Sequence, residues 1–229
     1  MPAKSSGTDR AQATRGLILA AAERLIVEHG IAAVSNRQIG EAAGQANSAA
    51  VWYHFGSKAD LVRAIAHRHG ERIEQQRVQM VERLDGSAEL ADWVACLVRP
   101  LIEHLAELGT PSWYARFVEM VMADPALRTI LQEEGLSRAV QDTIKAGLDR
   151  CRADLPADVV VDRQDMARLL IVHMCAERER TFAEGVAAGP AWDAVATGLI
   201  DAIVAIWLAP VTAADDTRPR DAAGEENLP

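Results

Sequence analysis

The sequence is poor in aromatic residues and lacks long runs in which apolar and polar residues alternate. Phe, Trp and Tyr account for 4% of its 229 residues, while hydrophobic residues account for 49% and Ala and Leu are abundant. Alternation is the mark of a half-buried strand, and the only β-like run, residues 158–161, is too short to imply a sheet. A chain of this length can bury a substantial core. We therefore predict an all-α fold.

Cysteines and membrane-length apolar segments are also scarce. Cys96, Cys151 and Cys175 show no C-x-x-C spacing, and the N-terminal segment MPAKSSGTDR is polar, unlike a secretory signal. No apolar run approaches the ~20 residues that a membrane span needs. We therefore expect a cytoplasmic protein with free thiols and no membrane contact. A thiol-based redox sensor stays an alternative, because sequence spacing does not say which cysteines meet in the fold.

Motifs of catalysis are missing from the sequence. It contains no glycine-rich phosphate loop, no H-E-x-x-H and no G-x-S-x-G. The nearest approach to a metal or nucleophile pair is His173-x-Cys175, and a lone pair of this kind is a weak signal. We therefore expect no enzymatic activity, no cofactor and no metal.

Acidic residues outnumber basic ones, but the two signs are unevenly distributed. The formal net charge is −9, with 24 Lys and Arg against 33 Asp and Glu. Residues 1–72 hold 9 of the basic and 6 of the acidic residues, so residues 73–229 hold 15 and 27. This asymmetry would turn the first part of the chain toward an anionic partner and keep the second part away from it.

Residues 35–61, SNRQIGEAAGQANSAAVWYHFGSKADL, predict a helix, a glycine turn, a short helix and a fresh helix start. Ser35 and Gln38 fit a capping box, and Ser57 with Asp60 repeats that signature. Gly44 can take the positive φ that ends a helix. A helix over about 9–29, closed by Gly30, precedes the stretch. This is the order of a helix-turn-helix, in which one helix braces on the DNA backbone and the next enters the major groove.

The stretch from Thr14 to Ile65 resembles the DNA-binding head of TetR-family transcriptional repressors. The matching marks are the Gly30 turn, Val34-Ser35-x-Arg37-x-Ile39, Ala43-Gly44 and, most specific, Tyr53-His54-Phe55-x-Ser57-Lys58-x-x-Leu61. The segment between Gly44 and Phe55 is one residue longer than the common family spacing, which leaves the base-reading register open by one position.

The resemblance implies a three-helix head followed by a C-terminal helical domain for ligand binding and dimerisation. It implies a homodimeric, sequence-specific repressor of a double-stranded DNA operator, released by a small apolar or amphipathic effector. A TetR-like activator is an alternative that the sequence does not separate from a repressor.

The predicted DNA-binding residues lie at the starts of the two motif helices, at the end of the second and at the start of the helix that follows. They are Ser35, Asn36, Arg37, Gln45, Asn47, Ser48, Ala49, Trp52, Tyr53, His54 and Lys58. The family places phosphate contacts at the positions of Ser35, Arg37 and Lys58. The alternatives are packing inside the head for Trp52 and Tyr53, capping alone for Ser35, and plain solvation for Lys58.

The chain is predicted to divide into a flexible arm (1–8), the helix-turn-helix head (9–56), a helical ligand-binding and dimerisation domain (57–210) and a disordered tail (211–229). Helices are expected at 57–83 with a break at Gly70, at 88–107 with a kink at Pro100, and at 112–123, 125–133 and 136–152. A loop at 153–162 and two long helices at 163–185 and 190–208 complete the prediction.

Two further sites are predicted in the second domain. A ligand pocket, which is mostly apolar with a few polar groups, would be lined by Trp93, Cys96, His104, Trp113, Phe117, Met120, His173, Met174 and Glu177. A dimer interface on the last two helices would include Leu170, Phe182, Ile200, Ile203 and Trp207. The alternatives are that the first set is ordinary core and that the last two helices bury both faces within one chain.

Overall fold

The computed structural model describes residues 5–45, 49–84, 86–135, 137–152, 154–185 and 191–211. Within these ranges the chain forms ten helices and no strand, in agreement with the predicted fold class. They are α1 (Ser5–His29), α2 (Asn36–Ala42), α3 (Ala49–Phe55), α4 (Lys58–Arg83), α5 (Leu90–Leu108), α6 (Tyr114–Ala123), α7 (Pro125–Glu133), α8 (Arg138–Cys151), α9 (Ala157–Ala183) and α10 (Trp192–Leu208).

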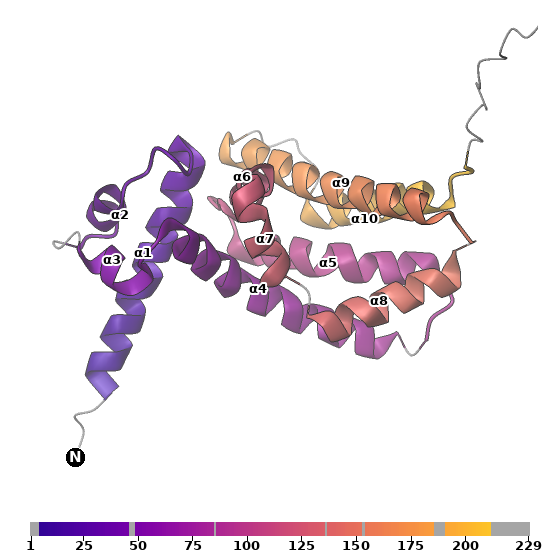
Figure 1. The fold of residues 1–229 in the computed structure, drawn as a ribbon, viewed down its shortest axis with the longest axis horizontal. Helices are drawn as coiled ribbons and strands as arrows, with labels where there is room; N and C mark the ends of the chain where they lie inside the picture. Colours follow the sequence, from indigo (N-terminus) through magenta and orange to yellow (C-terminus); the bar gives the residue numbers. More distant parts are fainter. Residues whose placement is uncertain are drawn as a thin grey trace, which may run out of the picture.

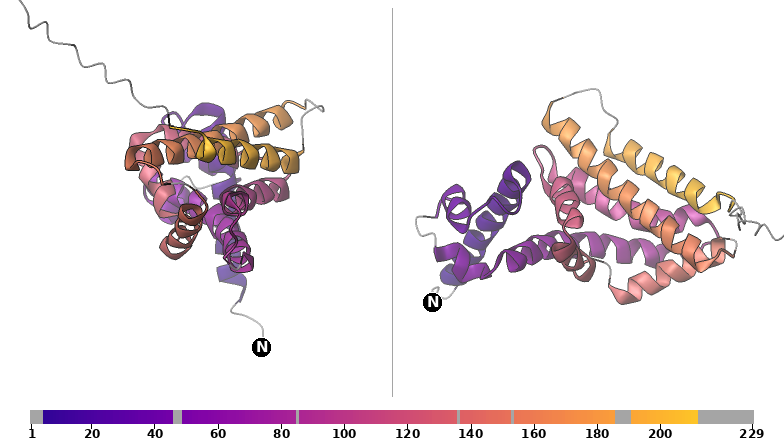
Figure 2. Two further views of the ribbon diagram at one scale, coloured as in Figure 1. Left: turned by 90° about the vertical axis from the view of Figure 1, so that its right-hand side faces the viewer. Right: turned by 45° about the horizontal axis from the view of Figure 1, so that its top comes forward.

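The helices separate into a small head, α1 to α3, and a larger body, α5 to α10 (Figure 1). The long helix α4 begins in the head and runs along the body, where it packs on α5. α5 also packs extensively on α10, and α9 lies beside α10 along one side of the body (Figure 2). α6 and α7 lie where the head meets the body, and α6 contacts α1 directly.

The head is built by the local signals that the sequence predicts. Ser35 and Ser57 each close a capping box, with Gln38 and Asp60 as the reciprocal partners. Gly44 has φ +69°, and the amides of Gly44 and Gln45 bond the carbonyls of Glu41 and Gly40. This pair of bonds is a Schellman motif, which needs the left-handed conformation that glycine adopts without strain. These contacts fix the turn between α2 and α3.

Two helix starts differ from the prediction. α1 starts at Ser5, so residues 5–8 of the predicted arm are helical, while residues 1–4 and the predicted tail from residue 212 lie outside the described ranges. α9 starts at Ala157, so most of the predicted loop at 153–162 is wrong. Pro156 precedes the first turn of α9 and Asp158 lies within it, and both are favourable at a helix start. The β-like run of valines at 159–161 concealed these start signals in the sequence.

The predicted break at Gly70 is also wrong, because α4 continues through it. A Cβ atom built at Gly70 would lie 2.7 Å from the carbonyl oxygen of Glu134. The glycine therefore permits the close approach of α4 to the end of α7 and does not interrupt the helix. Pro100 likewise lies within the continuous helix α5.

Candidate functional site

The start of α2 presents polar side chains on a rigid frame. Ser35 accepts the Gln38 amide at 3.3 Å and the Gln38 side chain accepts the Ser35 amide at 2.9 Å. Arg37 is exposed and its only ion pair among the described residues is with Glu41, at 3.2 Å on the next turn. Ile39 on the opposite side is buried. The guanidinium is therefore free to exchange a weak surface ion pair for an external anion.

Helix α3 buries one face in the head and exposes the other. Val51 and Phe55 are buried, whereas Tyr53 is 86% exposed. The alternative in which Tyr53 packs inside the head is therefore wrong. His54 is half-buried, and its ring meets the Tyr53 ring edge-on with centroids 5.5 Å apart. Of the other predicted DNA-binding residues, Asn47 and Ser48 and the side chains of Ala49 and Trp52 lie outside what the structure describes.

Lys58 and Gln45 use their side chains within the head. The Lys58 ammonium donates to the carbonyls of Ile31 at 2.6 Å and Ala32 at 3.1 Å, which ties the start of α4 to the turn between α1 and α2. The side-chain Nε2 of Gln45 donates to the Ala43 carbonyl at 3.2 Å. Lys58 retains a third N–H donor, so its phosphate contact stays a prediction beside an observed structural role.

The predicted ligand residues do not converge on one cavity. Trp93, Cys96, His104 and Phe117 are buried, Trp113 and Met120 are half-buried, and His173, Met174 and Glu177 lie exposed on the outer face of α9. None of them lines either of the two cavities between α4, α5 and α9. Their helical spacing marked ordinary core and surface, which is the alternative that the sequence left open.

The two cavities lie between helices of the body and share one wall. A chamber of about 260 Å³ extends toward α6 and α7, and one of about 620 Å³ extends toward α8. Five residues line both: Arg77, Leu97, Arg168, Ile171 and Val172. The larger chamber lies within the size range of small-molecule sites. Sequence reasoning missed this wall because its members come from three helices.

A chain of buried polar groups connects the head to the body. His69 on α4 bonds Glu23 on α1 through Nε2, at 3.0 Å, and His104 on α5 through Nδ1, at 2.8 Å. All three side chains are buried, and the Tyr114 ring of α6 stacks on His69 with centroids 3.9 Å apart. Tyr114 also lines the smaller chamber. The one available signal was an acidic residue, Glu23, set within the apolar stripe of the first helix.

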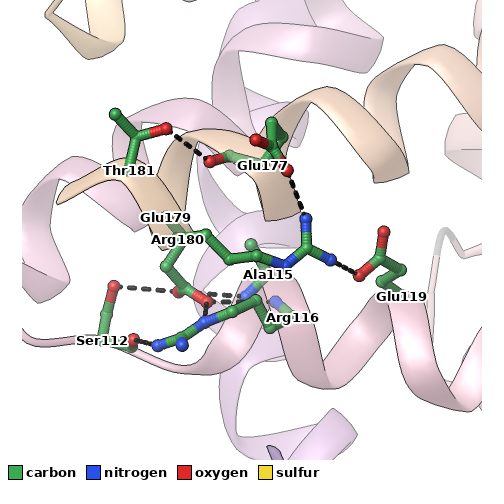
Figure 3. A network of polar contacts seen from close by, with 8 residues as sticks. All are labelled: Ser112, Ala115, Arg116, Glu119, Glu177, Glu179, Arg180 and Thr181. Carbon is green, nitrogen blue, oxygen red and sulfur yellow. Dashed lines mark hydrogen bonds and ion pairs between the residues drawn. The ribbon is translucent and has the colours of Figure 1, made fainter. Parts of the chain in front are cut away.

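A second polar network fastens α6 to α9 (Figure 3). Glu179 is 2% exposed and its carboxylate accepts four hydrogen bonds at 2.9–3.2 Å, from Ser112 Oγ, the amides of Ala115 and Arg116, and Arg116 Nε. The carboxylate thus occupies the N-terminal end of α6, where free amides favour negative charge. Nearby, Arg180 bridges Glu119 and Glu177. The first turn of α6, which carries Tyr114, is therefore held at a fixed position on α9.

The dimer residues predicted on α10 are part of the chain's own core. Ile200, Ile203 and Trp207 are buried, and α10 packs mainly on α5. Their assignment to a subunit interface is corrected accordingly. Leu170 is half-buried, and Phe182 is half-buried with its ring edge-on to Trp192. The exposed apolar residues of α9 are instead Val161, Met166, Leu169 and Met174.

Metal and membrane features are not found in the described part of the chain. Its residues form no group of three or more His, Cys, Asp or Glu side chains that could hold a metal ion. None of its helices is long and apolar enough to cross a membrane.

The described part of the chain therefore falls into the class of all-helical proteins that carry a helix-turn-helix head on a larger helical body. Residues 18–65 match the family of bacterial regulatory proteins described as the tetR family. Residues 18–65 of this chain are therefore a DNA-binding head of the TetR type.

Two known proteins extend the comparison. The HTH-type transcriptional regulator TtgR of Pseudomonas putida is 32% identical over 100 residues, which cover 44% of this chain and 45% of TtgR. The match thus spans less than half the length of that relative. The crystal structure of native NalD, the secondary repressor of the MexAB-OprM multidrug efflux pump in Pseudomonas aeruginosa, is 23% identical. It aligns over 86% of this chain and 98% of its own with a TM-score of 0.51, a likeness of fold.

Proposed function

We propose that the protein is a homodimeric, sequence-specific DNA-binding repressor that a small amphipathic effector releases from its operator. The observation that carries this proposal is the capped α2, Schellman turn and α3 unit, which exposes Tyr53 and lies within the segment that matches the TetR family. The similarity to TtgR, a transcriptional regulator, and to NalD, a repressor, supports the same function.

The proposed DNA contacts follow the two motif helices. α3 would enter the major groove and present Tyr53 and His54, while the start of α2, with Ser35, Asn36 and Arg37, would brace on phosphates. Lys58 would use its third N–H donor on a phosphate while it keeps its two bonds to the α1–α2 turn. Asn47, Ser48, Ala49 and Trp52 remain proposed contacts on the strength of their sequence positions alone.

DNA binding can be tested by fluorescence anisotropy of an upstream duplex and a scrambled duplex across a salt series. We expect selective binding with a logarithmic slope of about −0.9 per neutralised phosphate. Arg37→Ala is expected to weaken binding several-fold to about tenfold and to reduce the slope by about one, because it removes one phosphate contact.

The matched control is Arg83→Ala, which removes an exposed arginine at the far end of α4. Its affinity should equal that of the unaltered protein. Equal and weak binding of both duplexes by the unaltered protein would contradict the proposal, provided that a selection from random DNA also yields no preferred sequence.

We propose that the dimer forms through the outer face of α9 and the adjoining face of α10. Met166, Leu169 and Met174 are 53%, 45% and 40% exposed and recur at three- to five-residue spacing along α9. The neighbouring exposed face of α10 carries small residues, among them Ala194, Gly198 and Ala202, which allow close approach. A two-fold pair of heads would then contact two half-sites about one helical turn, ~34–36 Å, apart.

A single charge placed in the proposed α9–α10 interface should prevent dimerisation. Leu169→Glu should convert the dimer to a monomer at micromolar concentration, because an unpaired carboxylate would be buried between the subunits. Light scattering measures the mass directly. Leu17→Glu, at an exposed apolar position of α1 in the head, is the matched control and should leave the dimer intact. A monomeric mass for the unaltered protein would rule out the proposed dimer.

We propose that effector and DNA are coupled through Tyr114. Its ring lines the smaller chamber and stacks on His69, and His69 bonds Glu23 in the head. A ligand that moves this ring therefore changes the support of α1, and a differential affinity of ~1–3 kcal/mol between two head positions would be enough for regulation. Tyr114→Ala removes an effector contact as well as the stack on His69, so the variant is compared at effector concentrations that saturate it, where it should keep its operator. Full release by that variant, followed by anisotropy, would exclude this route.

The structure weighs against the thiol-based alternative. Cys96 and Cys175 are buried, and burial raises the pKa of the Cys96 thiol to about 11 and that of the Cys175 thiol to about 12. A redox sensor needs an accessible thiolate near neutral pH, so these two thiols are unsuited to that role. A reporter gene placed under the operator would separate an activator from a repressor.

A further inference from the structure

The wall shared by the two cavities has an unusual composition. Of its five residues, Leu97, Ile171 and Val172 are aliphatic, while Arg77 and Arg168 are cationic. No carboxylate belongs to this set. The surrounding part of the chain is strongly acidic, since residues 73–229 hold 27 Asp and Glu against 15 Lys and Arg. The two guanidiniums at the junction of the cavities are therefore positive charges within a part of the chain whose net charge is negative.

Arg77 is a buried cation with donor capacity to spare. It is 7% exposed, its Nε donates to the Cys96 carbonyl at 3.1 Å and its Nη1 donates to Glu74 at 3.0 Å. Nη2 makes no hydrogen bond to the described residues. Burial lowers the pKa of Arg77, because the lost hydration outweighs the attraction of Glu74. A second anion at this guanidinium would be stabilised, and the planar fork suits a carboxylate, sulfonate or phosphate.

The carboxylates near the cavities do not neutralise this pair from inside. Glu134 lines the smaller chamber but pairs with Arg63 and His67, and Asp149 lines the larger one but pairs with Arg152. Asp142 and Lys145 add one charge of each sign to the larger chamber. Arg168 bonds the exposed Asp165 through Nε and Nη2, and its Nη1 has no hydrogen bond within the described part of the chain.

The smaller chamber continues from this wall as an apolar space. Ala66, Ile73, Leu101, Val118 and Met122 line it together with the Tyr114 ring. We infer that the effector is an amphipathic organic anion whose acidic group binds between Arg77 and Arg168 and whose apolar part fills this chamber against Tyr114. The inference rests on the proposed effector site and names the chemical class that the site takes.

The test is direct binding to the full-length protein without DNA, by isothermal titration below the micelle concentration of each probe. Dodecanoate, dodecanol and dodecyltrimethylammonium share one apolar chain and differ in headgroup charge, and naphthalene sulfonate supplies a rigid anion. We expect at least one of the two anions to bind and the alcohol and the cation to bind about tenfold more weakly or not at all. Arg168→Gln should weaken binding of that anion by about tenfold.

Arg83→Gln is the matched control, because it makes the same charge change on α4 away from the cavities, and it should leave binding unchanged. Arg168 is half-buried, so its variant is expected to fold, which a thermal melt verifies; Arg77→Lys is the second variant, keeping the charge but losing the fork. Equal binding of dodecanol, or of the anion by Arg168→Gln, overturns the inference, as does binding of neither anion.

The inference and the proposed function fail in different ways. A protein that binds the operator selectively but neither anion has the proposed function and a different effector class. A protein that binds the anion but no DNA sequence keeps the site and loses the proposed function. The anisotropy assay with dodecanoate or naphthalene sulfonate then shows whether binding and release of DNA are linked.

Discussion

Replacing Glu179 by alanine is expected to lower the free energy of unfolding by about 3–5 kcal/mol, the cost of removing one partner of a buried, hydrogen-bonded ion pair. The Glu179 carboxylate accepts four hydrogen bonds at the start of α6 and is 2% exposed. Without it, the half-buried Arg116 guanidinium and the backbone amides of Ala115 and Arg116 would lose their acceptor. Urea unfolding, followed by circular dichroism, measures the change.

Two further variants separate the buried network from surface charge. Glu177→Ala removes an exposed carboxylate nearby on α9 that pairs with Arg180, and its effect should stay within about 0.5 kcal/mol. Glu179→Gln keeps an oxygen acceptor and should fall between the two. If Glu179→Ala and Glu177→Ala proved equally stable, the network in Figure 3 would not be what holds α6 on α9.

The head could be predicted nearly residue by residue because its signals are local. A capping box joins residues three apart, and a Schellman turn needs only a glycine and its neighbours. The sequence around Ser35, Gly44 and Ser57 is therefore enough to predict the two caps and the turn. The exposure of Tyr53 could not be settled in the same way. An aromatic residue at that spacing is compatible with either face of a seven-residue helix until the helix is docked.

The cavity and the interface depend on contacts between distant segments, and there the sequence was less informative. α10 is apolar over much of its circumference, so periodicity showed that Ile203 and Trp207 would be buried but not against what; they pack within the chain. The cavity wall draws Arg77 from α4, Leu97 from α5 and Arg168 from α9. Charged residues are ordinarily expected on a solvated face, so neither arginine was predicted as a ligand contact.

The buried chain Glu23–His69–His104, which joins head and body, is expected to make the protein less stable in mild acid. Burial, and after it the charge that His69 carries when protonated, lowers the pKa of His104 from 6.5 to about 4. His104 Nε2 bonds His69, and its Nδ1 is buried without a partner among the described residues, so a proton there would gain no acceptor. The other charges near this imidazole are those of Glu107, Arg72 and Arg68, together with Glu23 beyond His69.

The sign of the effect follows from proton binding. Below pH 6.5 the unfolded chain takes up a proton at His104 that the folded chain refuses until about pH 4. The contribution is therefore complete above pH 6.5 and is lost as the pH falls to about 4. Linkage gives a loss of about 2 kcal/mol by about pH 5. Because the same imidazole supports His69 and, through it, Glu23, the head should loosen from the body over this range.

His104→Gln provides the decisive comparison, since glutamine can still bond His69 but does not titrate. The variant is expected to be less stable than the unaltered protein at neutral pH and to lose about 2 kcal/mol less between about pH 6.5 and pH 5, as measured by urea unfolding at each pH. His29→Gln, at an exposed position of α1, corrects for the general effect of removing a histidine. Parallel pH profiles for the unaltered protein and His104→Gln would show that the acid sensitivity arises elsewhere and that His104 is not protonated only on unfolding.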